Sequence, residues 1–230
     1  MSKSVVDAIG GYFELELPLG HGEYYPEAYC FQSARAAFLA LLQVGKPARV
    51  WMPRYLCDSL FEPLRQVNIP FVLYSINENL EVADSIKLVD NEWLLYVNYF
   101  GVCDHQVTQV LEHFPSGQVV IDHSQAFFSP PPDCLATIYS PRKFFGIPDG
   151  GYLVTNMLVS EPAQEDTDSL LRCTHLLKRL AVGPEHGYAD YCAAEASLCG
   201  LPPLRMSKLT HRLLSSIDYE FVKVRRKHNF

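Results

Sequence analysis

The chain has 230 residues, of which 48% are hydrophobic and 20% charged, and this balance predicts one large or two small globular domains. Its formal net charge of −7 excludes the strongly basic surface that nucleic-acid binding requires. The sequence has no run of about 18 apolar residues, so we expect no membrane span.

The N-terminus and the cysteines predict a cytoplasmic protein. Residues 1–20 lack the basic head and the apolar block of a signal peptide. The seven cysteines are scattered and form no Cys-x-x-Cys pair, so their spacing predicts neither a zinc site nor a redox pair. Reduced thiols in a bacterial-type cytosol are the simplest interpretation.

The first predicted elements are a strand and a helix. Phe13, Leu15 and Leu17 alternate with two glutamates, which is the pattern of a half-buried strand. Ser33 is a favourable N-cap for the Ala/Leu-rich run behind it, so we expect a helix within residues 31–42. A serine at a helix N-terminus, with free backbone N–H groups behind it, can hold a phosphate.

Strand-like apolar runs then alternate with helix-like runs along the chain. The expected strands are residues 49–53, 69–75, 92–101, 118–122, 135–139 and 150–155. The expected helices between them are residues 55–67 and 104–114. This alternation predicts a parallel sheet with right-handed crossovers.

The last third of the chain is predicted to be helical. Amphipathic runs predict helices over residues 169–180, 188–198 and 206–225, with a loop over residues 183–187.

A carboxylate and a lysine each follow a buried strand of the predicted sheet. Asp122 ends the run 118–122, and Lys143 comes shortly after the run 135–139. If the strands are parallel, both side chains lie in one crevice at their carboxyl ends. Such a pair suits pyridoxal phosphate, because the lysine forms the Schiff base and the carboxylate keeps the pyridine nitrogen protonated.

Four short motifs resemble those of the DegT/StrS family of sugar aminotransferases, which are fold-type I pyridoxal phosphate enzymes. Asp122-His-Ser-Gln125 is similar to the family's Asp-x-x-Gln segment, and Ser140-Pro-Arg-Lys143 to its Ser-x-x-Lys segment. Asp149-Gly-Gly151 is similar to its acidic-Gly-Gly turn, and Arg205-Met-Ser207 to a later segment.

The resemblance implies a three-layer α/β/α fold with a mostly parallel mixed sheet, in which residues 150–155 return antiparallel. It implies that residues 1–200 form the large cofactor-binding domain, with 1–30 as an N-terminal segment. Residues 201–230 would form a long helix leading toward a small C-terminal domain that is absent from this chain.

The resemblance also assigns roles to side chains. Lys143 would carry the Schiff base and move a proton as general base, and Asp122 would hold the pyridinium. The expected cofactor contacts, beyond these two, are Ser33, Ala34, Tyr55, Asn98, Gln125 and Ser140. No metal ligand is expected.

Each of these assignments has a structural alternative. Ser33 can be an ordinary helix cap, Tyr55 can pack on the rim of the sheet, and Asn98 can belong to a plain core strand. Asp122 can pair with a helix N-terminus, and Lys143 can be a surface lysine beside aromatic core residues.

The activity implied by the resemblance is transfer of an amino group from an amino acid to a nucleotide-linked keto-sugar, by a homodimer. A dehydratase or lyase on the same fold is an alternative. A truncated, non-catalytic homologue is another, because the small domain is absent. Pro203 also stands where the family has an asparagine that reaches the neighbouring subunit's cofactor.

Overall fold

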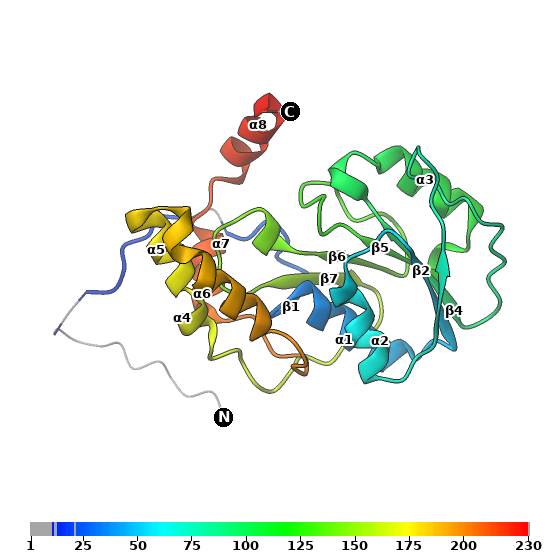
Figure 1. Cartoon of the computed structure of the whole chain (residues 1–230), viewed down its shortest axis with the longest axis horizontal. Coiled ribbons are helices and arrows are strands. Elements are labelled where there is room, and N and C mark those ends of the chain that lie inside the picture. Colours follow the sequence, from blue (N-terminus) through cyan, green and yellow to red (C-terminus); the bar gives the residue numbers. More distant parts are fainter. Residues whose placement is uncertain (1–10, 12, 21, 230) are drawn as a thin grey trace.

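A computed structural model describes residues 11, 13–20 and 22–229 of the chain. Its centre is one sheet of seven strands in the order β1-β7-β6-β5-β4-β2-β3 (Figure 1). The strands are β1 (Tyr29–Phe31), β2 (Arg49–Pro53), β3 (Phe71–Tyr74), β4 (Glu92–Val97), β5 (Val119–Asp122), β6 (Ala136–Tyr139) and β7 (Gly151–Thr155).

The sheet is mixed, and its larger part is parallel. Strands β6, β5, β4, β2 and β3 pair in parallel, whereas β7 runs antiparallel to both β6 and β1. The expected mostly parallel mixed sheet with helices, including the antiparallel return of residues 150–155, is therefore confirmed. All residues of β4, β5 and β6 are buried, as in a parallel sheet that is covered on both faces.

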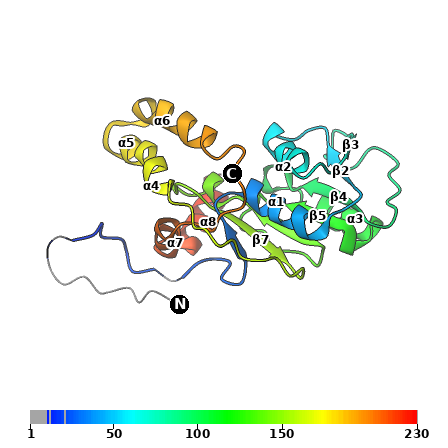
Figure 2. The same cartoon turned by 90° about the horizontal axis from the view of Figure 1, so that it is seen from below.

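The helices surround this sheet and extend to one side of it (Figure 2). They are α1 (Ala34–Gly45), α2 (Phe61–Gln66), α3 (Asp104–His113), α4 (Ser169–Arg172), α5 (Thr174–Val182), α6 (Pro184–Ala196), α7 (Lys208–Ser215) and α8 (Tyr219–Asn229). Helix α1 packs on β1, β6 and β7, and α3 packs against β4. Helices α4 to α7 gather at one end of the molecule, and α8 projects from it (Figure 1). In the described part of the chain, none of the helices has the length and apolar character needed to cross a bilayer.

The strand predicted near the N-terminus is wrong. Residues 13–17 have no regular secondary structure, and the Phe13 side chain is 98% exposed. An alternating pattern forms a strand only where a neighbouring strand supplies hydrogen bonds. At this edge of the sheet β7 pairs with β1, and residues 13–17 are not part of the sheet. The start of that predicted run, residues 9, 10 and 12, lies outside the described residues.

The long helix predicted over residues 206–225 is two helices, α7 and α8. The chain turns between them, where Asp218 Oδ1 accepts a hydrogen bond of 2.9 Å from the Phe221 N–H. The Tyr219 hydroxyl donates to the Leu214 carbonyl at 2.9 Å. An aspartate that accepts from nearby backbone N–H groups favours a new helix start over continuation. The helical pattern alone therefore overestimated the length of this element.

Other helix boundaries also differ from the expectation. The predicted helix 55–67 is a short 3₁₀ turn followed by α2, and the predicted helix 169–180 is divided into α4 and α5. The predicted loop 183–187 mostly belongs to α6, which begins at Pro184. Proline suits the first turn of a helix because backbone N–H groups there have no intrahelical acceptor, so the absence of one costs no hydrogen bond.

A glycine pair joins β7 to the N-terminus of α1. The Gly150 N–H donates to the Gln32 carbonyl at 2.7 Å, and Gly150 has a φ of +129°. A Cβ on Gly151 would lie 2.1 Å from the Ser33 carbonyl carbon and 2.2 Å from the Ala34 nitrogen. Only glycine allows this approach, which positions the start of α1 beside the sheet.

We expect Gly151→Ala to destabilise the protein by about 1–3 kcal/mol or more, because the added methyl group meets backbone atoms that cannot move aside. Urea denaturation followed by circular dichroism measures this change. Gly117→Ala is the matched control, since a Cβ there has nothing within 4 Å. Equal midpoints for the two variants would contradict this account.

Candidate functional site

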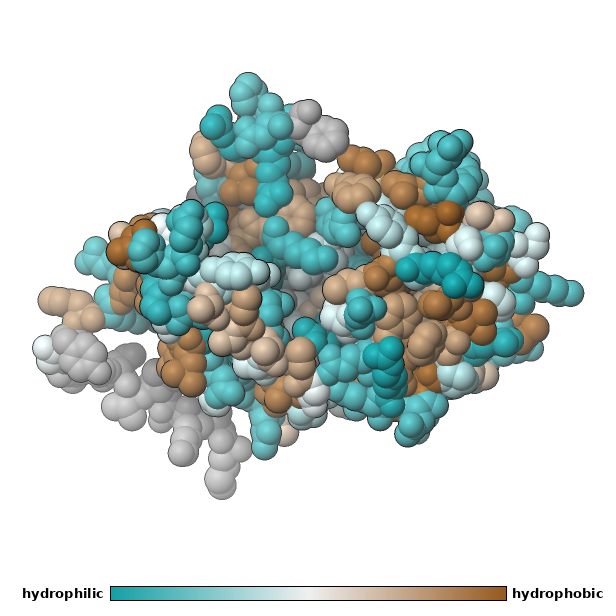
Figure 3. All heavy atoms as spheres, viewed as in Figure 1, coloured by the Kyte–Doolittle hydropathy of each residue, from teal (hydrophilic) through white to brown (hydrophobic). Residues whose placement is uncertain are grey.

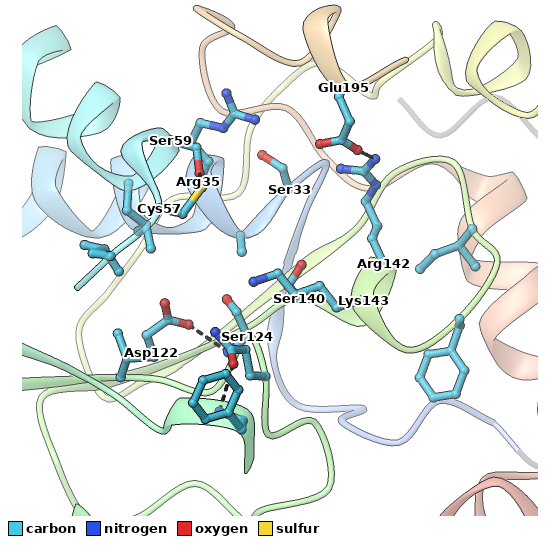
Figure 4. Close-up of a pocket in the computed structure, with 18 of the residues that line it drawn as sticks. Ser33, Arg35, Cys57, Ser59, Asp122, Ser124, Ser140, Arg142, Lys143 and Glu195 are labelled. Atoms are coloured by element: carbon cyan, nitrogen blue, oxygen red, sulfur yellow. Dashed lines mark hydrogen bonds and ion pairs between the residues drawn. The ribbon is translucent and has the colours of Figure 1, made fainter. Parts of the chain in front are cut away.

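A cavity of about 590 Å³ lies at the carboxyl ends of the parallel strands. Seven of the eight side chains or backbone positions predicted from the sequence line it (Figure 4). They are Ser33, Ala34, Tyr55, Asp122, Gln125, Ser140 and Lys143. Crevices at this edge of an open α/β sheet are the usual place for ligands.

Asp122 ends β5 and supplies a buried carboxylate to this cavity. The residue is 2% exposed, and its Oδ1 accepts a hydrogen bond of 2.7 Å from the Ser124 N–H. Burial raises the pKa of the Asp122 carboxyl, while hydrogen bonds from Ser124 and the charge of Lys143 lower it. A cationic group bound beside the carboxylate would offset the cost of its burial.

Lys143 reaches the same cavity from the next loop. It ends a short 3₁₀ helix, η4 (Pro141–Lys143), that follows β6, and its N–H donates to the Ser140 carbonyl at 3.1 Å. Figure 4 shows the Lys143 side chain extending into the space that Asp122 also faces. The structure therefore brings the predicted amine and the predicted carboxylate together.

Gln125 is oriented by the loop after β4. Its Oε1 accepts a hydrogen bond of 2.8 Å from the Phe100 N–H, so its amide nitrogen is the end that can donate to a ligand. Phe100 has a φ of +56° and Gly101 a φ of +73°. A Cβ on Gly101 would lie 2.6 Å from the Gln125 carbonyl oxygen, so this left-handed turn needs glycine.

The N-terminus of α1 faces the cavity from the other side. The Ser33 Oγ accepts a hydrogen bond of 3.1 Å from the Ala36 N–H, so the hydroxyl hydrogen is left to donate to a ligand. Ser33, Ala34 and Arg35 all line the cavity, as does the hydroxyl-bearing Ser140. A helix N-terminus with two serines and a positive side chain is suited to an anion such as phosphate.

Tyr55 lies at the rim of the cavity. Its side chain is 57% exposed, and its ring stacks on that of Tyr99 with centroids 5.6 Å apart. The Tyr99 hydroxyl donates to the Tyr55 carbonyl at 3.0 Å, which holds this loop against the sheet. The ring-stacking role expected for Tyr55 stays a prediction.

Asn98 is the one predicted site residue that does not line the cavity. It is fully buried, its Oδ1 accepts from the Cys103 N–H at 2.9 Å, and its Nδ2 donates to Asp104 Oδ1 at 2.7 Å. Both ends of the amide are therefore used to hold the start of α3. Its position after a buried strand resembled that of Asp122, but its hydrogen bonds go to the backbone and side chain of the next helix.

Arg142 and Glu195 are cavity residues that sequence reasoning missed. Their side chains form an ion pair, and Glu195 comes from α6, which thereby closes one side of the cavity (Figure 4). The Arg142 Nε and the His175 Nε2 are buried without a hydrogen-bond partner in the described part of the chain. Arg142 directly precedes Lys143, and that adjacency is the signal in the sequence that could have identified it.

No protein-family model and no curated protein matches this sequence. Solved structures do share its fold. The putative sugar aminotransferase Spr1654 from Streptococcus pneumoniae, in its PLP form, is 17% identical over 88% of this chain and 58% of its own, with a TM-score of 0.55. DesI with its TDP-sugar product is 19% identical over 88% of this chain and 51% of its own, with a TM-score of 0.52.

A third structure with this fold is the L-threonine-O-3-phosphate decarboxylase from Porphyromonas gingivalis. It is 14% identical over 86% of this chain and 54% of its own, with a TM-score of 0.51. At these identities the likeness establishes the fold and leaves the reaction open. The chain spans between one half and three fifths of the length of these three proteins.

We expect Asn98→Ala to lower the free energy of unfolding by about 1–3 kcal/mol, because it leaves the Cys103 N–H without its acceptor. Urea denaturation followed by circular dichroism measures this change. Asn156→Ala, at an exposed position, is the control for stability. Equal stability of Asn98→Ala and the wild type would contradict the structural role of these hydrogen bonds.

Proposed function

We propose that this chain binds pyridoxal phosphate and catalyses amino-group transfer from an amino acid to a nucleotide-linked keto-sugar. The observation that carries the proposal is the convergence of the Asp122 carboxylate and the Lys143 amine in one cavity, beside a helix N-terminus. The shared fold with a putative sugar aminotransferase in its PLP form supports it.

The residues of the cavity fit the cofactor. Its volume of about 590 Å³ lies within the range of small-molecule sites. Asp122 would hold the ring nitrogen protonated, and Ser33 and Ser140 would donate to the phosphate. The amide nitrogen of Gln125, oriented by the Phe100 N–H, would donate to the phenolic oxygen.

Bound pyridoxal phosphate supplies an electron sink for carbanion chemistry. The protein's own contribution is then positioning and proton transfer. Lys143 would take a proton from the donor carbon and return it to a neighbouring carbon as general base and acid. The buried carboxylate of Asp122 would keep the ring nitrogen in its cationic form.

Two arginines that line the cavity are candidates to contact an anionic substrate. Arg35 is paired with Glu62 at 2.8 Å and Arg142 with Glu195, and both arginines line the space above Lys143. DesI, whose structure holds its TDP-sugar product, shares the fold. A diphosphate-linked keto-sugar as acceptor and an amino acid such as glutamate as donor are consistent with these charges.

A dehydratase or lyase reaction is the alternative on the same cavity, because a decarboxylase also has this fold. The presence of Lys143, whose amine can shuttle the proton between two carbons, favours transfer. Assays that follow amine transfer, water elimination and carbon dioxide release on the same substrates separate these reactions.

Dimer formation and a cytoplasmic location stay predictions of the family resemblance. Large apolar side chains remain exposed on α4, α5 and α6, and apolar surface is visible on the face shown in Figure 3. These exposed residues are Leu170, Leu171, Leu177, Leu180, Val182, Tyr188 and Tyr191. Exposed apolar patches of this kind are typical of protein interfaces.

Incubation with pyridoxal phosphate followed by borohydride is expected to leave one cofactor adduct on the peptide that contains Lys143, measured by mass spectrometry. Lys143→Ala is expected to lose that adduct. Lys87→Ala, an exposed lysine outside the cavity, is expected to keep it. A Lys143→Ala protein that stays folded and is labelled to the same extent would exclude the proposed cofactor site.

Asp122→Asn is expected to keep the adduct on Lys143 but to slow amine transfer by roughly a hundredfold or more, as loss of one polar group at a reacting centre does. Single-turnover absorbance with glutamate measures the donor half of the reaction. Asp133→Asn, an exposed aspartate, is the control. An unchanged rate in Asp122→Asn would mean that another group sets the charge of the ring nitrogen.

A further inference from the structure

A second cluster of chemically reactive side chains lies at the β1 edge of the sheet, and none of its members lines the main cavity. It consists of Glu23, Cys30 and His211. One ligand atom from each of these residues lies within 4.8 Å of the other two. The three residues come from the segment before β1, from β1 itself and from α7.

We propose that Glu23, Cys30 and His211 bind a Zn²⁺ ion. A thiolate sulfur, an imidazole nitrogen and a carboxylate oxygen are the three ligand types that zinc takes in proteins. Softer metals prefer more sulfur and harder metals prefer only oxygen, so this mixed set favours zinc. Water would occupy the fourth position of the tetrahedron.

The carboxylate of Glu23 is already oriented for this role. Its Oε2 accepts a hydrogen bond from the hydroxyl of Tyr152, a fully buried residue of β7. Tyr152 stands directly opposite Cys30 in the antiparallel pair of β1 and β7. Groups that hydrogen-bond to a metal ligand fix the orientation of that ligand, and they are typical of metal sites in proteins.

The remaining oxygen of Glu23 points at the histidine. The distance between Glu23 Oε1 and His211 Nδ1 is 2.5 Å. Ligand atoms around a tetrahedral zinc ion stand roughly 3.3 Å apart, given metal–ligand bonds of about 2.0–2.3 Å. The distance between these two atoms would therefore have to increase by less than about one ångström to admit the ion.

The thiol of Cys30 is partly buried beside two carboxylates. Burial and the nearby charges of Glu23 and Glu161 raise its pKa to about 12, and its Sγ donates to the Ala28 carbonyl at 3.4 Å. Such a thiol is a poor nucleophile, which argues against a Cys-His-Glu catalytic triad. Zinc binding would displace the thiol proton and replace the ion pair between Glu23 and His211 with two metal–ligand bonds.

A route for the ion exists beside the cluster. Cys30 and His211 line a cavity of about 460 Å³, together with Glu161, Glu165, Arg205 and Lys208. The two glutamates offset the charge of the two basic residues along this route. Once bound, the ion would join α7 to the edge strand β1 and to the segment that contains Glu23.

Helix α7 is also held at its N-terminus. The buried carboxylate of Asp149 accepts hydrogen bonds of 2.8 Å from the Ser207 N–H and from the Ser207 hydroxyl. Zinc at His211 would add a second attachment within one turn of that cap. The proposed role of the site is therefore structural, and it is independent of the function proposed for the main cavity.

The test is a titration of the chelator-treated chain with Zn²⁺ in competition with a chromophoric chelator. The wild type is expected to bind one equivalent. Glu23→Gln, Cys30→Ser and His211→Ala are each expected to lower the affinity by at least about tenfold, since loss of even an outer partner costs this much. Cys192→Ser and His105→Ala, both at exposed positions, are the matched controls.

Two further measurements test the zinc site without the cluster variants, in case one of those variants does not fold. X-ray absorption at the zinc edge of the wild type is expected to show one sulfur neighbour and otherwise nitrogen and oxygen. Zinc is also expected to raise the melting temperature of the wild type and of both controls. The proposal fails if the wild type binds no stoichiometric zinc, if no sulfur neighbour is seen, or if all three cluster variants bind zinc like the controls.

Discussion

The cavity depends on a carboxylate that is buried at the end of a central strand. Asp122 follows three apolar residues of β5. Within the sheet, β5 lies between β4 and β6. An ionised carboxyl group in such a place costs several kcal/mol unless a positive group lies near it. Lys143, which follows β6, is the cation in the same cavity whose charge lowers the pKa of Asp122. A ligand with a cationic ring nitrogen would complete this arrangement.

A second constraint brings distant segments to this carboxylate. Gly150 and Gly151 allow β7 to begin against the backbone of Ser33, so the N-terminus of α1 faces the cavity. The neighbouring Asp149 holds the first turn of α7 through Ser207. The turn Asp149-Gly-Gly151 thus positions the N-termini of both α1 and α7. These contacts explain in structural terms why an acidic residue and two glycines occur together there.

The fold and the reaction rest on different kinds of observation. Sugar aminotransferase structures and a decarboxylase share this architecture with low sequence identity, so the architecture alone does not select a reaction. The proposed reaction depends on Asp122, Lys143 and the ion-paired Arg142. The α5–α6 hairpin contributes Glu195 to the cavity wall, so the ion pair with Arg142 connects the loop before Lys143 to these helices.

Local sequence was sufficient for β2 to β7 and for most of the cavity, whereas the short edge strand β1 was not predicted. Continuous apolar runs predicted β4, β5 and β6, and the polar residues directly after them predicted the cavity, because parallel strands present their carboxyl ends at one edge. The same reasoning also selected Asn98, which lies outside the cavity lining and bonds to the start of the next helix, since a sequence does not show whether an amide bonds to a ligand or to a helix. It also predicted a strand at residues 13–17, because periodicity does not reveal whether a partner strand is available.

Tertiary structure alone decided which residues from distant positions meet. Glu195 approaches Arg142, and His211 approaches Glu23 and Cys30, across separations in the chain that carry no short motif. The spacing of the cysteines predicted no zinc site, because that reasoning considers only ligands close together in sequence. Apolar pattern and turn residues act over a few positions and are therefore readable from the sequence. Contacts between side chains on separate elements depend on how the whole chain packs.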